Sequence, residues 1–163
     1  MNFDNGALRI DSSYAYGYPY AQSAIAIKTP NPKLFVIEGD VKTDYREIWL
    51  GLRNSNGQGF HFGFTYSGFC IQGNDINKME SCTDQAMQFR SYEDWMHIKV
   101  VVNDNVITGY VGTATVLTVT TNTTFMPGYV TAELWDAPYS IAGQVVNDIT
   151  GWFDNITVYG YGY

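Results

Sequence analysis

The sequence predicts an all-β fold, an antiparallel two-sheet β-sandwich with jelly-roll topology. Side-chain character alternates along most of the chain, and Gly, Asn, Asp or Pro separates the alternating segments. No stretch places apolar residues at positions i, i+3, i+4 and i+7 for even three helical turns. Short strands with frequent turns are typical of sandwiches and jelly rolls. The 163 residues suffice for one domain spanning 1–163.

The first five predicted strands lie before residue 67. They cover 7–10, 24–28, 34–42, 47–54 and 59–66. The first two alternate in the short runs ALRI and AIAIK, and the other three alternate over longer stretches. Side chains at i and i+2 share a face of a strand. The sets predicted to face the core are therefore Phe35, Ile37, Gly39 and Val41, then Ile48, Leu50 and Leu52, then Phe60, Phe62 and Phe64.

Six further strands are predicted in the rest of the chain. They cover 87–91, 95–103, 106–112, 114–121, 129–135 and 152–160. The inward sets are Met87 and Phe89, then Met96, Ile98, Val100 and Val102, then Val130, Ala132 and Leu134. The tripeptide at 103–105, Asn-Asp-Asn, predicts a tight hairpin between two of these strands. One helical turn is expected in the least strand-like stretch, 75–85.

The outward sets mix charged, amide and aromatic side chains. If their strands share one sheet, its exposed face carries Glu38, Trp49, Arg53, His61, Gln88, Arg90, His97, Glu133 and Trp135. Aromatic rings cover the apolar C–H face of a sugar, and amide, carboxylate and guanidinium groups hydrogen-bond its hydroxyls. These nine residues are the predicted ligand-binding set. The alternative is an ordinary solvated face, since any antiparallel sheet with one wet side alternates.

Composition and charge exclude several classes of partner. The net charge of -7 and the pI near 4.5 argue against nucleic acid, which requires clustered Lys and Arg. No apolar run approaches the ~20 residues of a membrane-spanning helix, so no membrane insertion is expected. The N-terminus has no features of a signal peptide, and the chain is expected to be a domain of a longer secreted protein.

The two cysteines, Cys70 and Cys82, are predicted to form a disulfide that closes a loop containing Gly, Asn and Asp. Two free thiols are the alternative. Asn122 and Asn155 begin glycosylation tripeptides, which point in the same direction as a disulfide. An extracellular or cell-surface location is therefore expected.

The later segments resemble a known group of sandwiches. WMHIKVVVNDNVITGYVG, GYVTAELW and GWFDNITVYG are similar to the late strands of concanavalin A-like lectins and glucanases, laminin-G-type domains and many carbohydrate-binding modules. FVIEGDVKT and EIWLGLRN resemble the early strands of the same group. The resemblance extends from about residue 34 onward, and it implies a carbohydrate-related sandwich.

Catalysis is the less favoured expectation. Glucanases of this group carry a strand motif Glu-x-Asp-x with a second Glu shortly after it, and the outer glutamates are nucleophile and general acid. Here Glu38 and Asp40 match the first part, but position 42 is Lys and the second glutamate is missing. Glu38 with Asp40, or Glu38 with Glu133 across the face, remain the candidate hydrolase pairs. Neighbouring Lys and Arg residues oppose the raised pKa that a general acid needs.

Metal binding is not expected to be central. His61 and His97 with a carboxylate lack a characteristic zinc spacing. Calcium is the better candidate, because Asp154 could meet Asp4 or Asp11 where the first and last strands pair. A backbone-capping role for Asp154 is the favoured alternative.

The leading functional prediction is a non-catalytic, lectin-like module that binds a polysaccharide or cell-surface glycan through the face of Trp49 and Trp135. The alternative is a structural or adhesion domain of a surface protein, fibre or virion. In that case the Tyr-rich segments at 14–22 and 159–163 would form an oligomer interface. A glycoside hydrolase is the third prediction.

Overall fold

The computed structural model describes residues 2–13, 20–28, 34–43, 47–53, 59–65, 68–73, 80–84, 88, 94–121, 128–135, 140–141, 144–145 and 148–160. For 2–4, 11–13, 20–28, 80, 135, 140–141, 144–145 and 148–149 it describes only the backbone. Within these ranges the chain forms strands, with no helix long and apolar enough to cross a membrane.

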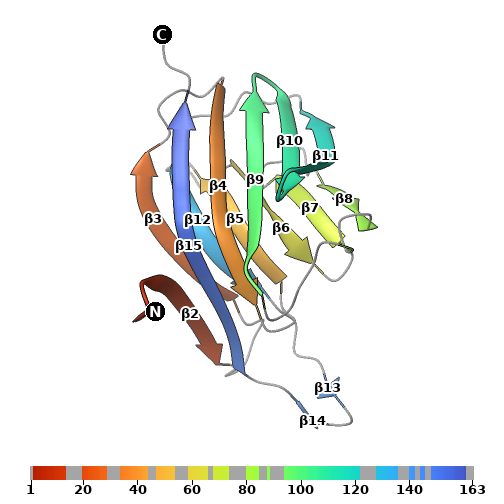
Figure 1. The fold of residues 1–163 in the computed structure, drawn as a ribbon. Helices are drawn as coiled ribbons and strands as arrows, with labels where there is room; N and C mark the ends of the chain where they lie inside the picture. The colour runs from red at the N-terminus through yellow and green to blue at the C-terminus, as the bar shows by residue number, and fades with distance from the viewer. Residues whose placement is uncertain are drawn as a thin grey trace.

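Two antiparallel sheets pack face to face as the layers of a sandwich (Figure 1). The seven-stranded sheet has the order β1 (Asn2–Asp4), β2 (Ala7–Ser13), β15 (Asp148–Gly160), β4 (Leu34–Thr43), β9 (Met96–Asn103), β10 (Val106–Val111) and β11 (Ala114–Thr120). The six-stranded sheet has the order β3 (Tyr20–Lys28), β12 (Tyr129–Trp135), β5 (Glu47–Arg53), β6 (Gly59–Thr65), β7 (Gly68–Gly73) and β8 (Glu80–Thr83). A two-stranded ribbon joins β13 (Ser140–Ile141) to β14 (Gln144–Val145). The predicted all-β sandwich is confirmed.

The core lies between the two sheets and contains the side chains that alternation assigned to it. Phe35, Ile37, Ile48, Leu50, Leu52, Phe60, Phe62, Phe64, Ile98, Val100, Val102, Val130, Ala132 and Leu134 are all at most 1% exposed. Met87 and Phe89 lie outside the described residues. Burial of so many aromatic and branched side chains is the dominant favourable term in the stability of the sandwich.

Consecutive strands often belong to different sheets. β4 lies in the seven-stranded sheet and β5, the next strand along the chain, lies in the six-stranded sheet. β12 and β15 are divided in the same way and lie in opposite layers (Figure 1). Their outward side chains therefore point away from opposite sides of the core. This crossing between layers determines which polar residues can meet.

Two hairpins and one bulge shape the seven-stranded sheet. Asp104, with a φ of 56°, turns the chain between β9 and β10, which confirms the hairpin predicted at 103–105. Asn5 and Gly6, with φ of 50° and 90°, make the turn between β1 and β2. Asn-Gly is the dipeptide that two-residue hairpins favour. In β15 the pairing with β4 gains one extra residue after Asp154.

Within 75–85, where one helical turn was expected, Glu80–Thr83 forms strand β8, whose backbone pairs with β7. Asp84, directly after β8, has 3₁₀-helical backbone and is exposed, and the remaining residues of the stretch lie outside the described ranges. The strand expected at 87–91 was wrong at the one residue of it that is described. Gln88 is exposed and belongs to no strand, while the rest of the expected strand 87–91 is not described.

Candidate functional site

The nine residues of the predicted ligand-binding set do not share a face. Glu38 and His97 lie on β4 and β9 of the seven-stranded sheet, whereas Trp49, Arg53, His61 and Glu133 lie on β5, β6 and β12 of the six-stranded sheet. The assumption of one common sheet was wrong, because alternation identifies the side of a strand but not its sheet. Trp135 ends β12 opposite Glu47, but its side chain is not described. Arg90 also lies outside the described residues, and Gln88 is exposed between β8 and β9.

The outer face of the six-stranded sheet holds a buried ion pair. Arg53 donates from Nε to Oε1 of Glu133 at 2.9 Å and from Nη2 to Oε2 at 2.8 Å. Thr131 donates a third hydrogen bond to Oε1 at 2.7 Å. Gly51 leaves room for this arrangement, since a Cβ there would lie 3.3 Å from Oε1 and closer still to the Thr131 hydroxyl.

Glu133 is an ionised carboxylate in this setting. Burial alone would raise its pKa, but the hydrogen bonds from Arg53 and Thr131 and the Arg53 charge outweigh burial and hold the pKa below its usual value. Its side chain is 0% exposed. It can therefore accept hydrogen bonds, but it is a poor general acid at neutral pH.

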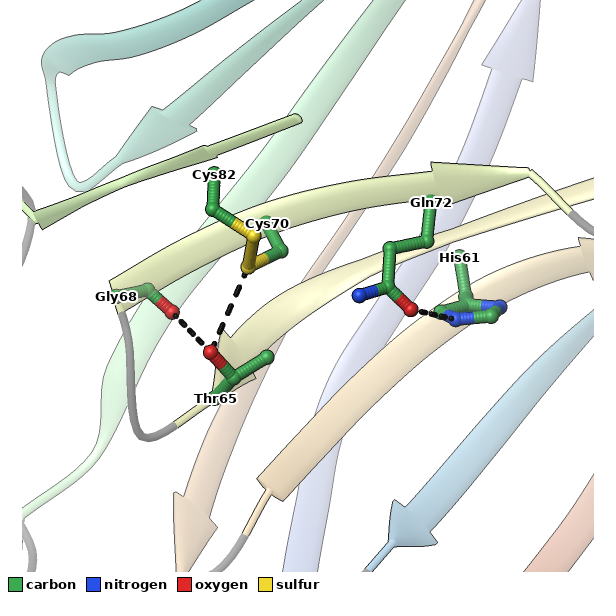
Figure 2. The surroundings of a disulfide bond; sticks show 6 residues. All are labelled: His61, Thr65, Gly68, Cys70, Gln72 and Cys82. Atoms are coloured by element: carbon green, nitrogen blue, oxygen red, sulfur yellow. Dashed lines mark hydrogen bonds between the residues drawn. A yellow bond between two sulfur atoms is a disulfide. The ribbon is translucent and has the colours of Figure 1, made fainter. Parts of the chain in front are cut away.

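Trp49 and His61 pack edge to face beside this pair, with ring centroids 4.7 Å apart. His61 Nε2 lies 3.1 Å from Oε1 of Gln72 (Figure 2). Burial lowers the pKa of His61, against the opposing effects of the Glu133 charge and the Gln72 hydrogen bond. Trp49 is 0% and His61 2% exposed. The expectation that these two residues and Glu133 lie on a solvated face was wrong, and a fully buried indole presents no surface for a sugar to stack on.

The predicted disulfide is confirmed on this sheet. Cys70 of β7 and Cys82 of β8 are directly opposite in register and are bonded to each other (Figure 2). The Thr65 hydroxyl donates to the Gly68 carbonyl at 3.3 Å and lies 3.5 Å from Sγ of Cys70. The bond joins β7 to β8, the last strand of the sheet order, covalently.

The outer face of the seven-stranded sheet carries a connected polar cluster. His97 Nδ1 lies 2.8 Å from Oδ1 of Asp40, and its Nε2 lies 3.6 Å from Oε2 of Glu38. Asn155 donates from Nδ2 to Oδ2 of Asp40 at 2.7 Å. Tyr159 donates from its hydroxyl to Oε2 of Glu38 at 3.4 Å. These five side chains hold one another in place across β4, β9 and β15.

A pocket of about 300 Å³ adjoins this cluster. Its lining residues are Asn5, Ala7, Lys42, Trp95, Trp152 and Asp154. Trp152 of β15 is paired in register with Lys42 of β4 on one side and Arg9 of β2 on the other. Lys42 Nζ lies 5.3 Å and Arg9 Cζ 5.7 Å from the indole centroid, within the range of cation–π attraction. Trp95, which directly precedes β9, is 45% exposed.

Sequence reasoning missed this pocket. It assigned neither Trp95 nor Trp152 to a site. Trp152 and Asp154 are two positions apart on one strand, so they share a face. The Asn-Gly turn at 5–6 was a second signal, because it places Asn5 at the rim.

The described residues provide no complete ligand set for the candidate calcium site at Asp154. No group of three or more His, Cys, Asp or Glu side chains there could hold a metal ion. Asp154 accepts a hydrogen bond from the backbone N–H of Asn155 at 2.7 Å. This is the backbone-capping role that was its alternative. The side chains of Asp4 and Asp11 are not described.

Of the two candidate catalytic pairs, only one lies on a single face of a sheet. Glu38 and Glu133 lie on the outer faces of different sheets, so their predicted meeting was wrong. Glu38 and Asp40 do share a face, as predicted. Both oxygens of Asp40 already lie within hydrogen-bond distance of protein groups, Oδ1 of His97 and Oδ2 of Asn155.

Comparison with known proteins extends the structural finding. No protein-family model matches the chain, and no curated protein matches it by sequence. Solved structures do match. A native glycosidic hydrolase superposes with a TM-score of 0.68 at 13% identity, over 99% of this chain and 81% of the other. The carbohydrate-binding module CBM66 from Bacillus subtilis superposes with a TM-score of 0.57 at 14% identity, over 89% and 83%.

A sialidase gives a TM-score of 0.65 at 12% identity, over 98% of this chain. The chain spans only 16% of the length of that sialidase. At these identities the likeness concerns the fold, and it agrees with the two antiparallel sheets described above. The chain therefore shares the antiparallel two-sheet sandwich fold of these proteins.

Proposed function

We propose that this chain is a non-catalytic carbohydrate-binding module that holds a glycan in the pocket between Trp95 and Trp152. One observation carries the proposal: two tryptophans, an ammonium, an amide and a carboxylate surround a single hollow on an open sheet face. The volume of about 300 Å³ lies at the lower end of the ~300–1,000 Å³ typical of small-molecule sites.

Each lining group has a role toward a sugar. The exposed ring of Trp95 offers an apolar surface for the C–H face of a pyranose. Asp154 accepts hydrogen bonds from hydroxyl groups, while Lys42 and Asn5 donate to them. Lys42 and Arg9, on the two strands that neighbour β15, both make cation–π contacts with the Trp152 ring and so hold the indole in position.

The same geometry favours binding over hydrolysis. Glycoside hydrolysis ordinarily requires two carboxyl groups flanking the scissile bond. Asp154 is the one carboxylate among the residues described as lining the pocket. Asp40, its register partner on β4, has both oxygens within hydrogen-bond distance of His97 and Asn155. The fold itself occurs in both hydrolases and binding modules, so it supports a carbohydrate-related role without choosing between them.

A polysaccharide or cell-surface glycan as the partner agrees with the rest of the chain. The disulfide supports an extracellular or cell-surface setting, because such bonds persist in oxidising compartments. Within this proposal, residues 1–163 act as one binding domain.

The test is affinity electrophoresis of the wild-type chain through gels containing β-glucan, mannan, xylan or fructan. At least one polymer should retard it, and Trp95→Ala should weaken that binding at least tenfold, or about 1.4 kcal/mol. Trp95→Phe should retain most of the affinity because it keeps a ring. Tyr129→Ala is the matched control, since Tyr129 is exposed but lies on the six-stranded sheet.

Two outcomes would overturn the proposal. One is the absence of retardation in every polymer. The other is a Trp95→Ala chain that binds as well as the wild type. Release of reducing ends from the bound polymer would instead favour the hydrolase, which was the third prediction from the sequence.

A further inference from the structure

We infer that the pocket is the first subsite of a longer binding track, so that the ligand is a linear glycan of at least three sugar units bound along β4. This inference rests on the proposed function. We define the track as the pocket followed by Asp40, His97, Asn155, Glu38 and Tyr159. It occupies the outer face of the seven-stranded sheet, over β4, β9 and β15.

The track is longer than a single sugar. Lys42, Asp40 and Glu38 are successive outward residues of β4. At about 3.3 Å per residue, their Cα atoms are spaced by about 7 Å, and the ends are about 13 Å apart. These three levels provide one position for a sugar in the pocket, one beside Asp40 and one beside Glu38.

The bulge in β15 brings Asn155 and Tyr159 to the same face as the second and third levels of β4. Regular alternation from Trp152 and Asp154 would turn Ile156 and Val158 outward and would bury Thr157 and Tyr159. One extra residue enters the pairing between Asp154 and Thr157, and Asn155 adopts a φ of 50°. Ile156 and Val158 consequently pack against the core. Bulges commonly re-aim side chains in this way.

After the bulge, Asn155 and Tyr159 stand on the same face as the pocket. The Asn155 amide reaches Asp40, and the Tyr159 hydroxyl reaches Glu38. Tyr159 is 38% exposed, so it offers a second aromatic surface at the end of the track opposite Trp95 and Trp152. Two aromatic surfaces separated by hydrogen-bonding groups suit consecutive units of one chain.

The polar groups of the track are already ordered before any ligand arrives. His97 lies within 2.8 Å of Asp40 and 3.6 Å of Glu38, and therefore links the two carboxylates. A surface whose side chains are fixed in advance loses less entropy on binding. The network therefore favours a ligand that contacts all three levels together.

The test measures affinity against chain length. The probes are oligosaccharides of one to six units prepared from whichever polymer in the panel retards the wild-type chain, measured by isothermal titration. Affinity should rise at least tenfold from one unit to three or four and then level off. Tyr159→Ala should weaken binding of the tetrasaccharide about fivefold and leave the monosaccharide unchanged, whereas Trp95→Ala should weaken both.

Tyr159→Phe serves as a matched control because it keeps the ring and removes only the hydroxyl, and thermal melting checks the folding of each variant. Equal affinities for one and four units would overturn the track and leave the pocket intact. A folded Tyr159→Ala chain that binds the tetrasaccharide normally would overturn the track as well. Failure of every polymer to bind would overturn the proposed function itself, so the two failures are distinguishable.

Discussion

Replacing Arg53 with Met should destabilise the fold substantially, because the Glu133 carboxylate would remain buried without its cation. Removal of one partner of a buried ion pair typically costs about 3–5 kcal/mol. Arg53 is itself 21% exposed, which places the expected loss near the lower end, about 3 kcal/mol. In a chain of this size that corresponds to a fall in melting temperature of about 6–12 °C.

The assay is urea unfolding at pH 7, followed by tryptophan fluorescence and circular dichroism in a buffer without reductant, which keeps the disulfide intact. The double variant Arg53→Met/Glu133→Leu should recover most of the lost stability, since an apolar pair of similar volume replaces the charges. The cycle should give a coupling energy of at least about 2 kcal/mol. Thr131→Val, which removes one hydrogen bond to the same carboxylate, should cost only about 1 kcal/mol.

The pH dependence provides a second check on the same pair. In the wild type the pKa of Glu133 is below its usual value, so its contribution to stability is complete above the usual pKa and is lost as pH falls. In Arg53→Met, burial dominates and raises the pKa, so the carboxyl takes up a proton at a higher pH. The stability gap between the two chains should therefore narrow from pH 7 to pH 4. A loss below about 1 kcal/mol at pH 7, or a gap independent of pH, would refute the reasoning.

Two further outcomes concern the same sheet. Burial lowers the pKa of His61, so the stability that its neutral form contributes is complete above the ordinary histidine pKa and is lost as pH falls. The melting temperature of the wild type should therefore decline from pH 7 to pH 5, and that of His61→Gln should decline less steeply. Parallel curves of melting temperature against pH for the two chains would contradict this. Reduction of the Cys70–Cys82 bond by dithiothreitol should lower the free energy of unfolding by about 2–4 kcal/mol. The double variant Cys70→Ala/Cys82→Ala should be insensitive to the reductant, and an equal response of both chains would show that the bond is not the cause.

The core could be predicted from alternation alone. In β4 and β9, the residues assigned inward, such as Ile37 and Val100, are fully buried. The physical reason is local: successive side chains of a strand point to opposite sides, so apolar residues at every second position show which side faces the core. The disulfide could also be predicted from the sequence, because the two cysteines flank a short loop.

The site could not be predicted in the same way. Whether Glu38 and Glu133 meet depends on the sheet to which β4 and β12 belong, and that is decided by long-range pairing. Alternation assigns both Trp95 and Trp49 outward and so cannot distinguish them, although Trp95 is exposed and Trp49 is buried. The position of Tyr159 depends on one inserted residue in β15, which reverses the alternation that follows it.

That inserted residue also separates the identity of the exposed side chains of β15 from the folding of the strand. Ile156 turns inward beside Gly39, where a Cβ would lie 3.1 Å from Ile156 Cγ1 and 3.1 Å from Leu50 Cδ1. Packing in the core therefore determines which side chains of β15 face inward. This orientation does not depend on the side chains that meet solvent. Positions such as 157 and 159 can change identity while the strand keeps its register. Under the proposed function, the outer face of this sheet is thus a surface on which new glycan preferences can evolve at little cost to the stability of the sandwich.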